Sequence, residues 1–297
     1  MSSLLHDAVE IIKSEGFTGP HSLIFLIRYA SLAEDRTLLR MIGNTLEEMS
    51  SMEESAALAY AYAEYYEASG GTECDFCPAA ADYILSECPE DDRMLAAAYV
   101  KCARAFGKEE YLEKASDLLA DNEKTAGNAA FSVLAFLEMY RATFNRLYLE
   151  TAKSMADIIE KNFQGIFDPE DAYDLARPSM NSAIAVMYDE LARITQEPKR
   201  IQARRRQNTL IAKLADRYPS KVAFGLCALL ADEFEAKTVV CRFKGQVLPD
   251  PLLSLISFYS PVTEIIAESV PEEDDSFSSK AKYYFLKNGI LEEITGL

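Results

Sequence analysis

Two histidines are the side chains of this chain that titrate nearest neutral pH, where general acid–base catalysis needs a proton donor or acceptor. They are His6 and His21, and both lie near the N-terminus. His21 directly follows Pro20 at the expected start of a helix. We therefore expect an exposed or capping side chain there and not a catalytic base.

Two cysteines in the segment Cys74–Pro78 have the C-x-x-C spacing of a redox dithiol. The segment lies at an expected helix N-terminus, which lowers the pKa of a thiol, but Glu73 and Asp75 act in the opposite direction. No strand pattern precedes it, as a thioredoxin-like context requires, and adding Cys88 still leaves a zinc site without a clear fourth ligand. We expect ordinary thiols, no metal and no cofactor.

A polar cluster stands at the expected start of another helix and contains Arg177, Ser179, Asn181 and Ser182. Small polar side chains at such a position either cap the helix or donate hydrogen bonds into a pocket at its mouth. Capping by Ser179 is the simpler interpretation, and contact of the cluster with a ligand is the functional one. Both interpretations remain open at this point.

Acidic residues outnumber basic ones, 48 to 30, which gives the chain a formal net charge of −18. This charge repels nucleic acid and anionic membranes, so we expect neither as a partner. A basic cluster at Lys199–Arg206 suits a phosphate or an acidic protein surface. The simpler interpretation is a solvated helix face that balances the acidic body.

Helical periodicity extends over most of the chain, and residues that favour helices, such as Ala, Leu, Met and Glu, are frequent in it. We expect helices at about 4–14, 20–33, 36–50, 54–69, 78–88, 91–106, 109–120, 128–143, 146–162, 179–195, 197–217 and 221–235.

Successive helices form pairs, and pairs begin near 54, 91, 128, 179 and 221, at intervals of roughly 40 residues that are typical of stacked αα-hairpins. Residues 23–27 and much of 131–140 are apolar on every face, as in helices buried on all sides, whereas 146–162 keeps a charged face. The pattern predicts a ring of inner helices surrounded by outer ones. An open superhelical array is the alternative.

The pattern changes after residue 235. Strands are expected at 238–243, 262–267 and 283–286, a short helix at 252–258, and a mobile acidic loop at 271–279. We therefore divide the chain into a helical domain, 1–235, and a small α/β appendage, 236–297, packed on it.

The chain contains no run of about 18 apolar residues that would span a bilayer. Its first residues lack the basic segment and the long apolar core of a signal peptide. Six cysteines are too few for a disulfide scaffold in a chain of this size. We expect a cytoplasmic protein with reduced thiols.

Four short motifs resemble one known family. Residues 17–29 resemble its KFP-x-P…FLLRY segment, 45–49 its TL-x-x-M, 139–144 its LYEATF and 178–182 its PSGNS. The family is the helical part of the spermatogenesis-associated, thioredoxin-domain-containing proteins, which in turn is similar to N-acylglucosamine 2-epimerase and the six-hairpin glycosidases. The resemblance implies an all-α fold, an (α/α)6 toroid-like six-hairpin domain with a small C-terminal α/β appendage, here without the thioredoxin-like domain.

The same resemblance locates the family's pocket residues, and most of them differ here. Glu54 stands where the family has an Asp, its Trp-Asn pair falls near Asp91-Asp92, and Asn128 lies in the segment that replaces its DDYAF. The family's His and Lys after TL-x-x-M are absent, and this chain has no Trp. By the resemblance, the candidate catalytic carboxylates are Glu54 and Asp92, and the candidate pocket residues are Arg177, Ser179, Asn181, Ser182 and Asn128.

These residues are compatible with three functions. The favoured one is a divergent, non-catalytic member that binds a small polar or sugar-like ligand, or a protein partner, because most reactive groups of the family's pocket are lost. The second is an active carbohydrate epimerase or glycoside hydrolase that uses Glu54 and Asp92 as an acid/base pair. The third is a helical-repeat scaffold with an open concave surface.

Overall fold

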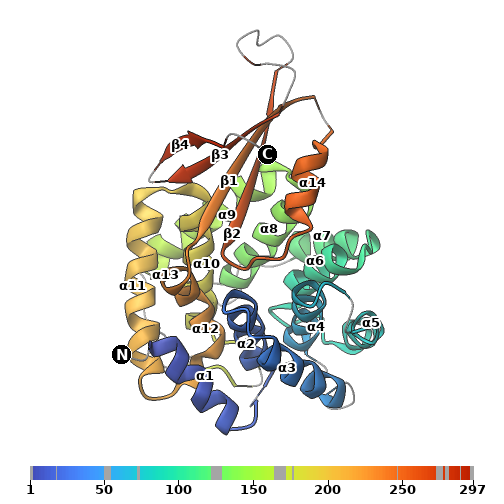
Figure 1. The fold of residues 1–297 in the computed structure, drawn as a ribbon, viewed down its shortest axis with the longest axis vertical. Coiled ribbons are helices and arrows are strands. Elements are labelled where there is room, and N and C mark those ends of the chain that lie inside the picture. The colour runs from blue at the N-terminus through green and yellow to red at the C-terminus, as the bar shows by residue number, and fades with distance from the viewer. Residues whose placement is uncertain are drawn as a thin grey trace.

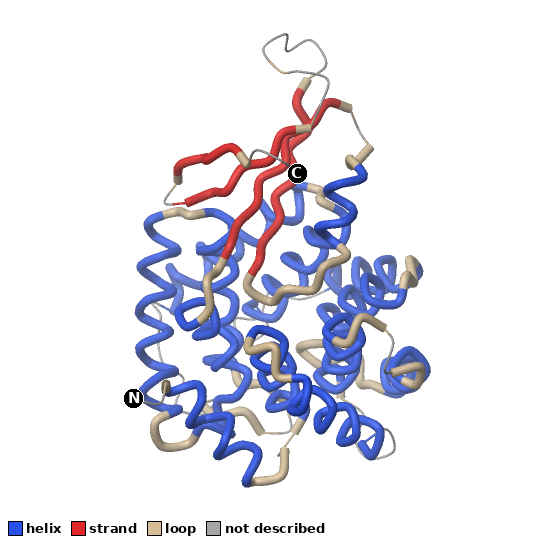
Figure 2. Tube along the Cα trace, in the orientation of Figure 1, coloured by secondary structure: helices blue, strands red, loops and turns tan. Residues whose placement is uncertain are grey.

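The computed structural model describes residues 3–17, 19–49, 55–71, 74–121, 129–163, 172–175, 177–245, 247–271, 277, 281–287 and 289–294. These residues form a mainly helical body and a small C-terminal sheet of four strands, which stands on one end of the body (Figures 1 and 2). Each helix in this part of the chain is too short or too polar to span a lipid bilayer.

The helices of the body follow the predicted order. They are α1 (Leu4–Ser14), α2 (Pro20–Leu32), α3 (Arg36–Met49), α4 (Ala56–Ala68), α5 (Cys77–Glu87), α6 (Leu95–Phe106), α7 (Glu110–Asp121), α8 (Ala129–Thr143), α9 (Arg146–Phe163), α10 (Met180–Thr195) and α11 (Pro198–Ala215). Their starts follow local chemistry: the side chains of Ser3, Ser55 and Ser179 each accept a backbone N–H of the first turn. Pro20 and Pro198 occupy the first turns of α2 and α11.

Inner and outer helices alternate along the chain. α2 packs on α4, α4 on α6, α6 on α8 and α8 on α10, while α3, α5, α7, α9 and α11 each pack on the helix before them (Figure 1). Leu23–Ile27 of α2 are fully buried, as are the residues of 131–140 on α8 apart from the half-buried Phe136. The prediction that these two segments are buried on all sides is therefore confirmed.

The predicted single helix at 221–235 is wrong. The chain instead makes four short turns, which are η1 (Pro219–Val222), α12 (Ala223–Leu226), η2 (Cys227–Leu229) and α13 (Leu230–Glu233). α12 contacts both α10 and α2. The approach is close, because a Cβ on Gly225 would lie 3.0 Å from Ser182 Oγ and 2.8 Å from Ile211 Cδ1. Packing against neighbours on several sides overrides the helical periodicity here.

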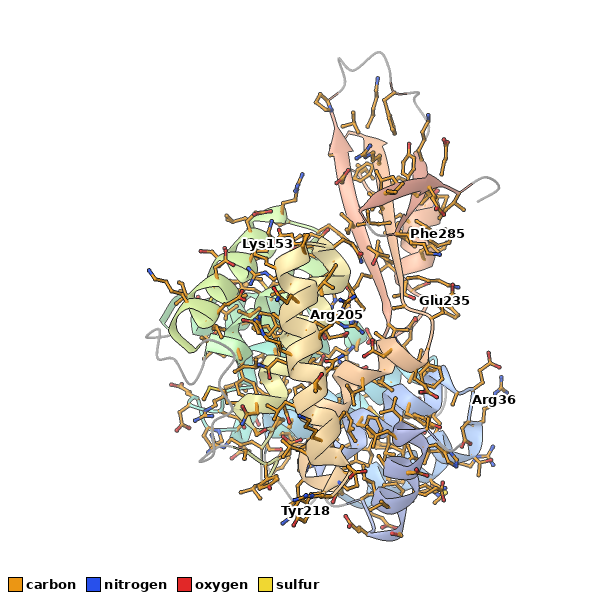
Figure 3. The ribbon with its side chains drawn as sticks, turned by 90° about the vertical axis from the view of Figure 1, so that its left-hand side faces the viewer. Arg36, Lys153, Arg205, Tyr218, Glu235 and Phe285 are labelled. Carbon is orange, nitrogen blue, oxygen red and sulfur yellow. The ribbon has the colours of Figure 1, made fainter. Side chains whose placement is uncertain are left out.

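The appendage is a mixed sheet with one helix. Its strands are β1 (Lys237–Lys244), β2 (Thr263–Val270), β3 (Lys282–Lys287) and β4 (Ile290–Glu293), in the order β2-β1-β3-β4. β1 and β2 are parallel and are connected through α14 (Asp250–Ile256), while the other pairs are antiparallel. The side view in Figure 3 shows the sheet above the helices, with Glu235 near the junction.

One face of the sheet packs on α14 through Val239, Cys241, Phe243, Leu252, Ala267 and Tyr283. Val262 and Ile266 contribute instead to the core of the helical body. Three strands and the helix were predicted, whereas β4 was not, because it is a four-residue edge strand that is half acidic. Most of the predicted acidic loop at 271–279 lies outside the described residues.

Candidate functional site

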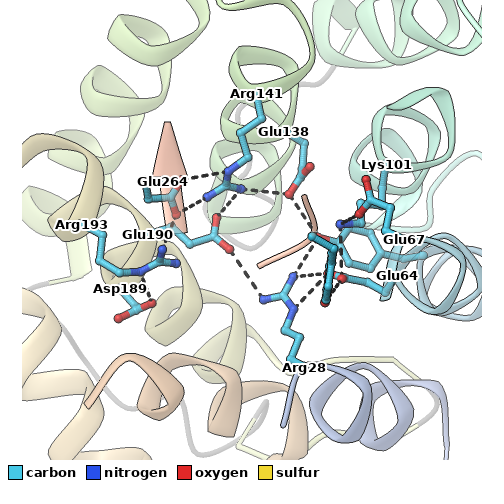
Figure 4. A network of polar contacts seen from close by, with 12 residues as sticks. Arg28, Glu64, Glu67, Lys101, Glu138, Arg141, Asp189, Glu190, Arg193 and Glu264 are labelled. Atoms are coloured by element: carbon cyan, nitrogen blue, oxygen red, sulfur yellow. Dashed lines mark hydrogen bonds and ion pairs between the residues drawn. The ribbon is translucent and has the colours of Figure 1, made fainter. Parts of the chain in front are cut away.

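A charged cavity of about 100 Å³ lies where the inner helices meet the C-terminal sheet (Figure 4). Its charged side chains are Arg28 from α2, Glu64 and Glu67 from α4, Lys101 and Arg104 from α6, Glu138 and Arg141 from α8, Glu190 from α10, and Glu264 from β2. The opposite side is formed by Ile256 at the end of α14 and by Phe258, Tyr259 and Pro261 of the segment that leads to β2. The cavity thus has a charged floor and a largely apolar roof.

Three successive inner helices supply these charges in pairs. The pairs are Glu64 and Glu67, Lys101 and Arg104, and Glu138 and Arg141, each three residues apart. Side chains at this spacing share one helix face. The pairs recur at the 37-residue interval that separates Glu67 from Arg104, so stacked hairpins bring them to one level. This repeat of charges inside apolar helices is the signal in the sequence that identifies the site. Of the candidate residues chosen from the sequence, those that the structure describes do not belong to it.

Carboxylates bind the arginines of the floor from several sides. Arg104 donates to both oxygens of Glu67, at 2.9 and 3.2 Å, and to Glu138 at 3.0 Å. Arg28 donates from Nε and Nη2 to Glu64, at 3.0 and 2.6 Å. Charge-assisted pairs of this kind are strong and fix the orientation of both partners.

Arg141 connects three elements. It donates to both oxygens of Glu264, at 3.1 and 2.8 Å, to Glu138 at 2.9 Å and to Glu190 at 3.0 Å. Arg193 of α10 also contacts Glu264. Glu264 therefore anchors β2 to the helical body through two cations.

The carboxyl groups of the floor differ in how readily they ionise. Burial raises the pKa of Glu64, but Arg28 and Lys101 outweigh it and hold the pKa at about 2. Burial likewise opposes the ionisation of Glu138, yet Arg104 and Arg141 hold its pKa well below the usual range. Glu190 is the exception, because burial raises its pKa and the attraction of Arg141 and Arg28 does not compensate.

Tyr259 closes the roof onto the floor. Its hydroxyl donates to Glu64 Oε2. Lys101 Nζ lies 5.5 Å from the centroid of the Tyr259 ring and 5.5 Å from that of Tyr60, within the range of a cation–π contact. Roof and floor are thus joined by one hydrogen bond and one cation.

Ser179, in the polar cluster at the start of α10, caps that helix. Ser179 Oγ accepts the N–H of Ser182 at 3.1 Å, and the N–H of Ser179 donates to Asp174 Oδ1 at 2.7 Å. The capping role predicted for Ser179 is confirmed. Asn181 and Ser182 are buried, and Arg177 is exposed. The lining of the charged cavity includes none of Arg177, Ser179, Asn181 and Ser182.

Asp92 also lies outside the cavity lining. Its carboxylate accepts the N–H of Met94 at 2.9 Å and that of Ala56 at 3.3 Å, so it holds the start of α4. Glu54 and Asn128 fall outside the described residues. The candidate residues taken from the resemblance and the charged cavity therefore do not coincide where the structure describes them.

The remaining candidates from the sequence are His21, the Cys74–Cys77 pair and the basic cluster at Lys199–Arg206. His21 is 2% exposed, so the expectation of an exposed side chain is wrong, because the start of α2 packs inside the body. The hydrogen bond with Cys74, together with burial, raises the pKa of Cys77, which favours the thiol over the thiolate. In the basic cluster, Arg200 and Lys199 both pair with Asp157 of α9.

Among the described residues, no three His, Cys, Asp or Glu side chains are placed to hold a metal ion. Comparisons of the chain with protein-family models and with curated proteins found no match. Function therefore has to be inferred from the cavity and the side chains that line it.

Proposed function

We propose that residues 1–235 form a divergent (α/α)6 toroid, as in the family that the sequence motifs resemble, and that it binds a small polar ligand in its central cavity without catalysing a reaction. Residues 236–297 form an appendage that covers this cavity. The order of helix contacts supports the toroid, because α12 packs on α10 at one side and on α2 at the other. That contact joins the last inner helix to the first and favours a closed ring over an open repeat array.

The observation that carries the proposal is the charged floor. Glu64, Lys101, Glu138, Glu190 and Glu264 are each less than 5% exposed. Buried ion pairs contribute little net stability compared with apolar packing of the same volume. Their gathering around one cavity, in helices that are otherwise apolar, is better explained by recognition of a polar molecule than by folding.

The arginines of the floor are already paired with carboxylates, which favours a ligand with hydroxyl groups over an anionic one. Arg104 and Arg141 each hold a carboxylate through two hydrogen bonds. A phosphate or carboxylate ligand would have to displace these partners, whereas hydroxyl groups both donate and accept and can add to existing pairs. A sugar-like ligand fits this requirement, and a protein partner would need a side chain that reaches the cavity.

The non-catalytic assignment depends on which groups are near the cavity. Neither His6 nor His21 lines it, and Asp92 is engaged by the backbone at the start of α4. The position of Asp92 therefore does not support the acid/base pair of Glu54 and Asp92 that was expected from the sequence.

One observation favours a second candidate function, a carbohydrate epimerase or glycoside hydrolase. Glu138 Oε1 and Glu190 Oε2 accept from the same nitrogen of Arg141, at 2.9 and 3.0 Å. The pKa of Glu138 is lowered by its arginines, and the pKa of Glu190 is raised by burial. Two neighbouring carboxyls whose pKa values are pushed apart are the arrangement of a base and an acid.

A binding and turnover screen tests both functions. The full chain is titrated by calorimetry with a panel of uncharged sugars, amino sugars and sugar phosphates, and each mixture is assayed for isomerised or hydrolysed product. We expect one class to bind at a single site without turnover, and Glu138→Gln to weaken binding about 10-fold or more, as expected for loss of a charge-assisted contact. The matched control is Glu113→Gln, an exposed acid on α7.

One result would count against the ligand site, and another against the non-catalytic assignment. If no compound binds, or if Glu138→Gln binds like the parent, the cavity is not the ligand site. Product formation that disappears in both Glu138→Gln and Glu190→Gln would establish the enzyme instead.

A further inference from the structure

Glu190 is the carboxyl of the cavity that its neighbouring cations pair least closely, through Arg141 at 3.0 Å and Arg28 at 3.8 Å. Among the described residues, the charged lining contains four cations, Arg28, Lys101, Arg104 and Arg141, and five carboxyls, Glu64, Glu67, Glu138, Glu190 and Glu264; Arg193 also pairs with Glu264. Glu190 Oε2 shares Arg141 with both Glu138 and Glu264. Glu190 Oε1 lies 3.8 Å from Arg28 Nη1, which is beyond hydrogen-bond distance.

Cationic, acidic and other titratable side chains from several elements surround Glu190. They include Arg28 from α2, Tyr60 from α4, Glu138 and Arg141 from α8, Arg193 on its own helix, Cys227 from η2 and Glu264 from β2. Burial raises the pKa of Glu190, the two arginines lower it, and Glu264 and Glu138 raise it further. The side chain is 4% exposed, so water does little to stabilise its charge. Glu190 Oε1 therefore has Arg28 at ion-pair distance, but Arg28 is too far away to donate a hydrogen bond to it.

The aromatic side chains of the cavity are suited to a cation as well. Phe144, Phe258 and Tyr259 line the cavity, and aromatic faces attract positive charge. Lys101 already lies over the Tyr259 ring at 5.5 Å. An ammonium group beside Glu190 would thus lie near a carboxyl and aromatic side chains.

We propose that the ligand is a hydroxylated primary amine, whose ammonium group binds beside Glu190 Oε1 while its hydroxyl groups contact the paired side chains of the floor. This inference rests on the proposed function, since it names the ligand class of the same cavity. Binding of the ammonium group stabilises the ionised form of Glu190.

Matched pairs of compounds that differ in one group provide the test. Calorimetry with the full chain compares 6-amino-6-deoxyglucose with glucose, 1-amino-1-deoxysorbitol with sorbitol, and ethanolamine with ethylene glycol. We expect the amine of each binding pair to bind about 10- to 100-fold more tightly at pH 7.5, the range for a hydrogen bond between charged groups. Its affinity falls as the pH is lowered towards 4.5, because protonation of Glu190 removes the charge that the ammonium group pairs with.

Variants separate the roles of charge and shape. In Glu190→Gln we expect the preference for the amine to disappear, while the uncharged member of the pair binds as before. Glu113→Gln, on the exposed face of α7, keeps the preference. Thermal unfolding of each variant shows that it is folded before binding is compared.

Failure of the inference and failure of the proposed function give different results. If the uncharged or the phosphorylated compounds of the wider panel bind as tightly as the amines, or if Glu190→Gln keeps the preference, the ammonium assignment is wrong and the ligand site stands. If neither the matched pairs nor the wider panel bind, both are wrong.

Discussion

At the scale of single residues, the carboxyls of the cavity floor differ in their effect on stability. Ionisation of Glu64 stabilises the fold, whereas ionisation of Glu190 does not. Arg28 and Lys101 keep Glu64 ionised, with its pKa at about 2. That stabilisation is present above pH 4.5 and is lost as the pH falls towards 2, because the unfolded chain takes up the proton first. Glu190 behaves in the opposite way, since the pKa of its folded form lies above its ordinary value.

Glu190→Gln is therefore expected to stabilise the protein at pH 7.5. A raised folded-state pKa means that the ionised carboxyl costs free energy in the native state, and glutamine removes that charge while keeping an acceptor for Arg141. The advantage shrinks as the pH is lowered through the folded-state pKa, and it disappears below pH 4.5, where the parent becomes protonated in both states. Urea unfolding at a series of pH values measures it; a variant that is less stable than the parent at pH 7.5 would contradict this sign.

At the scale of elements, short polar contacts hold loops that hydrophobic packing alone would leave free. Asp174 is 3% exposed and joins the segment before α10 to α12. Its two oxygens accept the backbone N–H groups of Ser179 at 2.7 Å and of Phe224 at 2.8 Å. Burial raises the pKa of this carboxyl, but both oxygens must remain acceptors.

Asp174→Asn is expected to lower the free energy of unfolding by about 1–3 kcal/mol, the cost of leaving a buried N–H without an acceptor. The carboxamide has only one acceptor oxygen, so its NH₂ group must face one of the two backbone N–H groups. Chemical denaturation at pH 7 measures the loss. Asp117→Asn on the exposed side of α7 controls for loss of charge. Equal stability of the two variants would show that the two hydrogen bonds accepted by Asp174 do not stabilise the fold.

The segment between α14 and β2 depends on Tyr259 in a similar way. Tyr259→Phe removes the hydrogen bond to Glu64 and keeps the ring beside Lys101. We expect faster amide hydrogen exchange at Tyr259 and Ser260 and a loss of about 1–2 kcal/mol in stability, as for a hydrogen bond to a charged group. Tyr83→Phe, at a side chain that is 55% exposed, is the control. Unchanged exchange in the Tyr259 variant would mean that other contacts close the roof.

The elements themselves could largely be predicted from the sequence, because helical periodicity, serine caps and first-turn prolines are local signals. The helix predicted at 221–235 failed because packing of Gly225 against Ser182 and Ile211 is not local. The cavity was missed for a related reason: Glu67, Arg104 and Arg141 each look like solvated helix charges until their helices are placed side by side. Only their common 37-residue interval links them within the sequence.

At the scale of the whole molecule, the appendage is bound to the body through charge as well as apolar contact. Glu264 on β2 is 3% exposed and lies between Arg141 and Arg193. Thr238 on β1 donates its hydroxyl to the carbonyl of Arg193 at 3.0 Å. Separating the sheet from the helices would leave these arginines with fewer partners, so the two parts should unfold together.

Glu264→Gln tests that coupling. We expect the free energy of unfolding to fall by about 3 kcal/mol, because removing one partner of a buried ion pair leaves the other charges uncompensated. Hydrogen exchange of the amides of β1 and α10 should accelerate by the same factor, since one opening event exposes both. Glu268→Gln, on the same strand, removes a partly exposed pair with Arg242, which is worth about 1 kcal/mol or less. Acceleration confined to the strands in Glu264→Gln would instead mean that the appendage undocks while the helices stay folded, and that the cavity can open to solvent from that side.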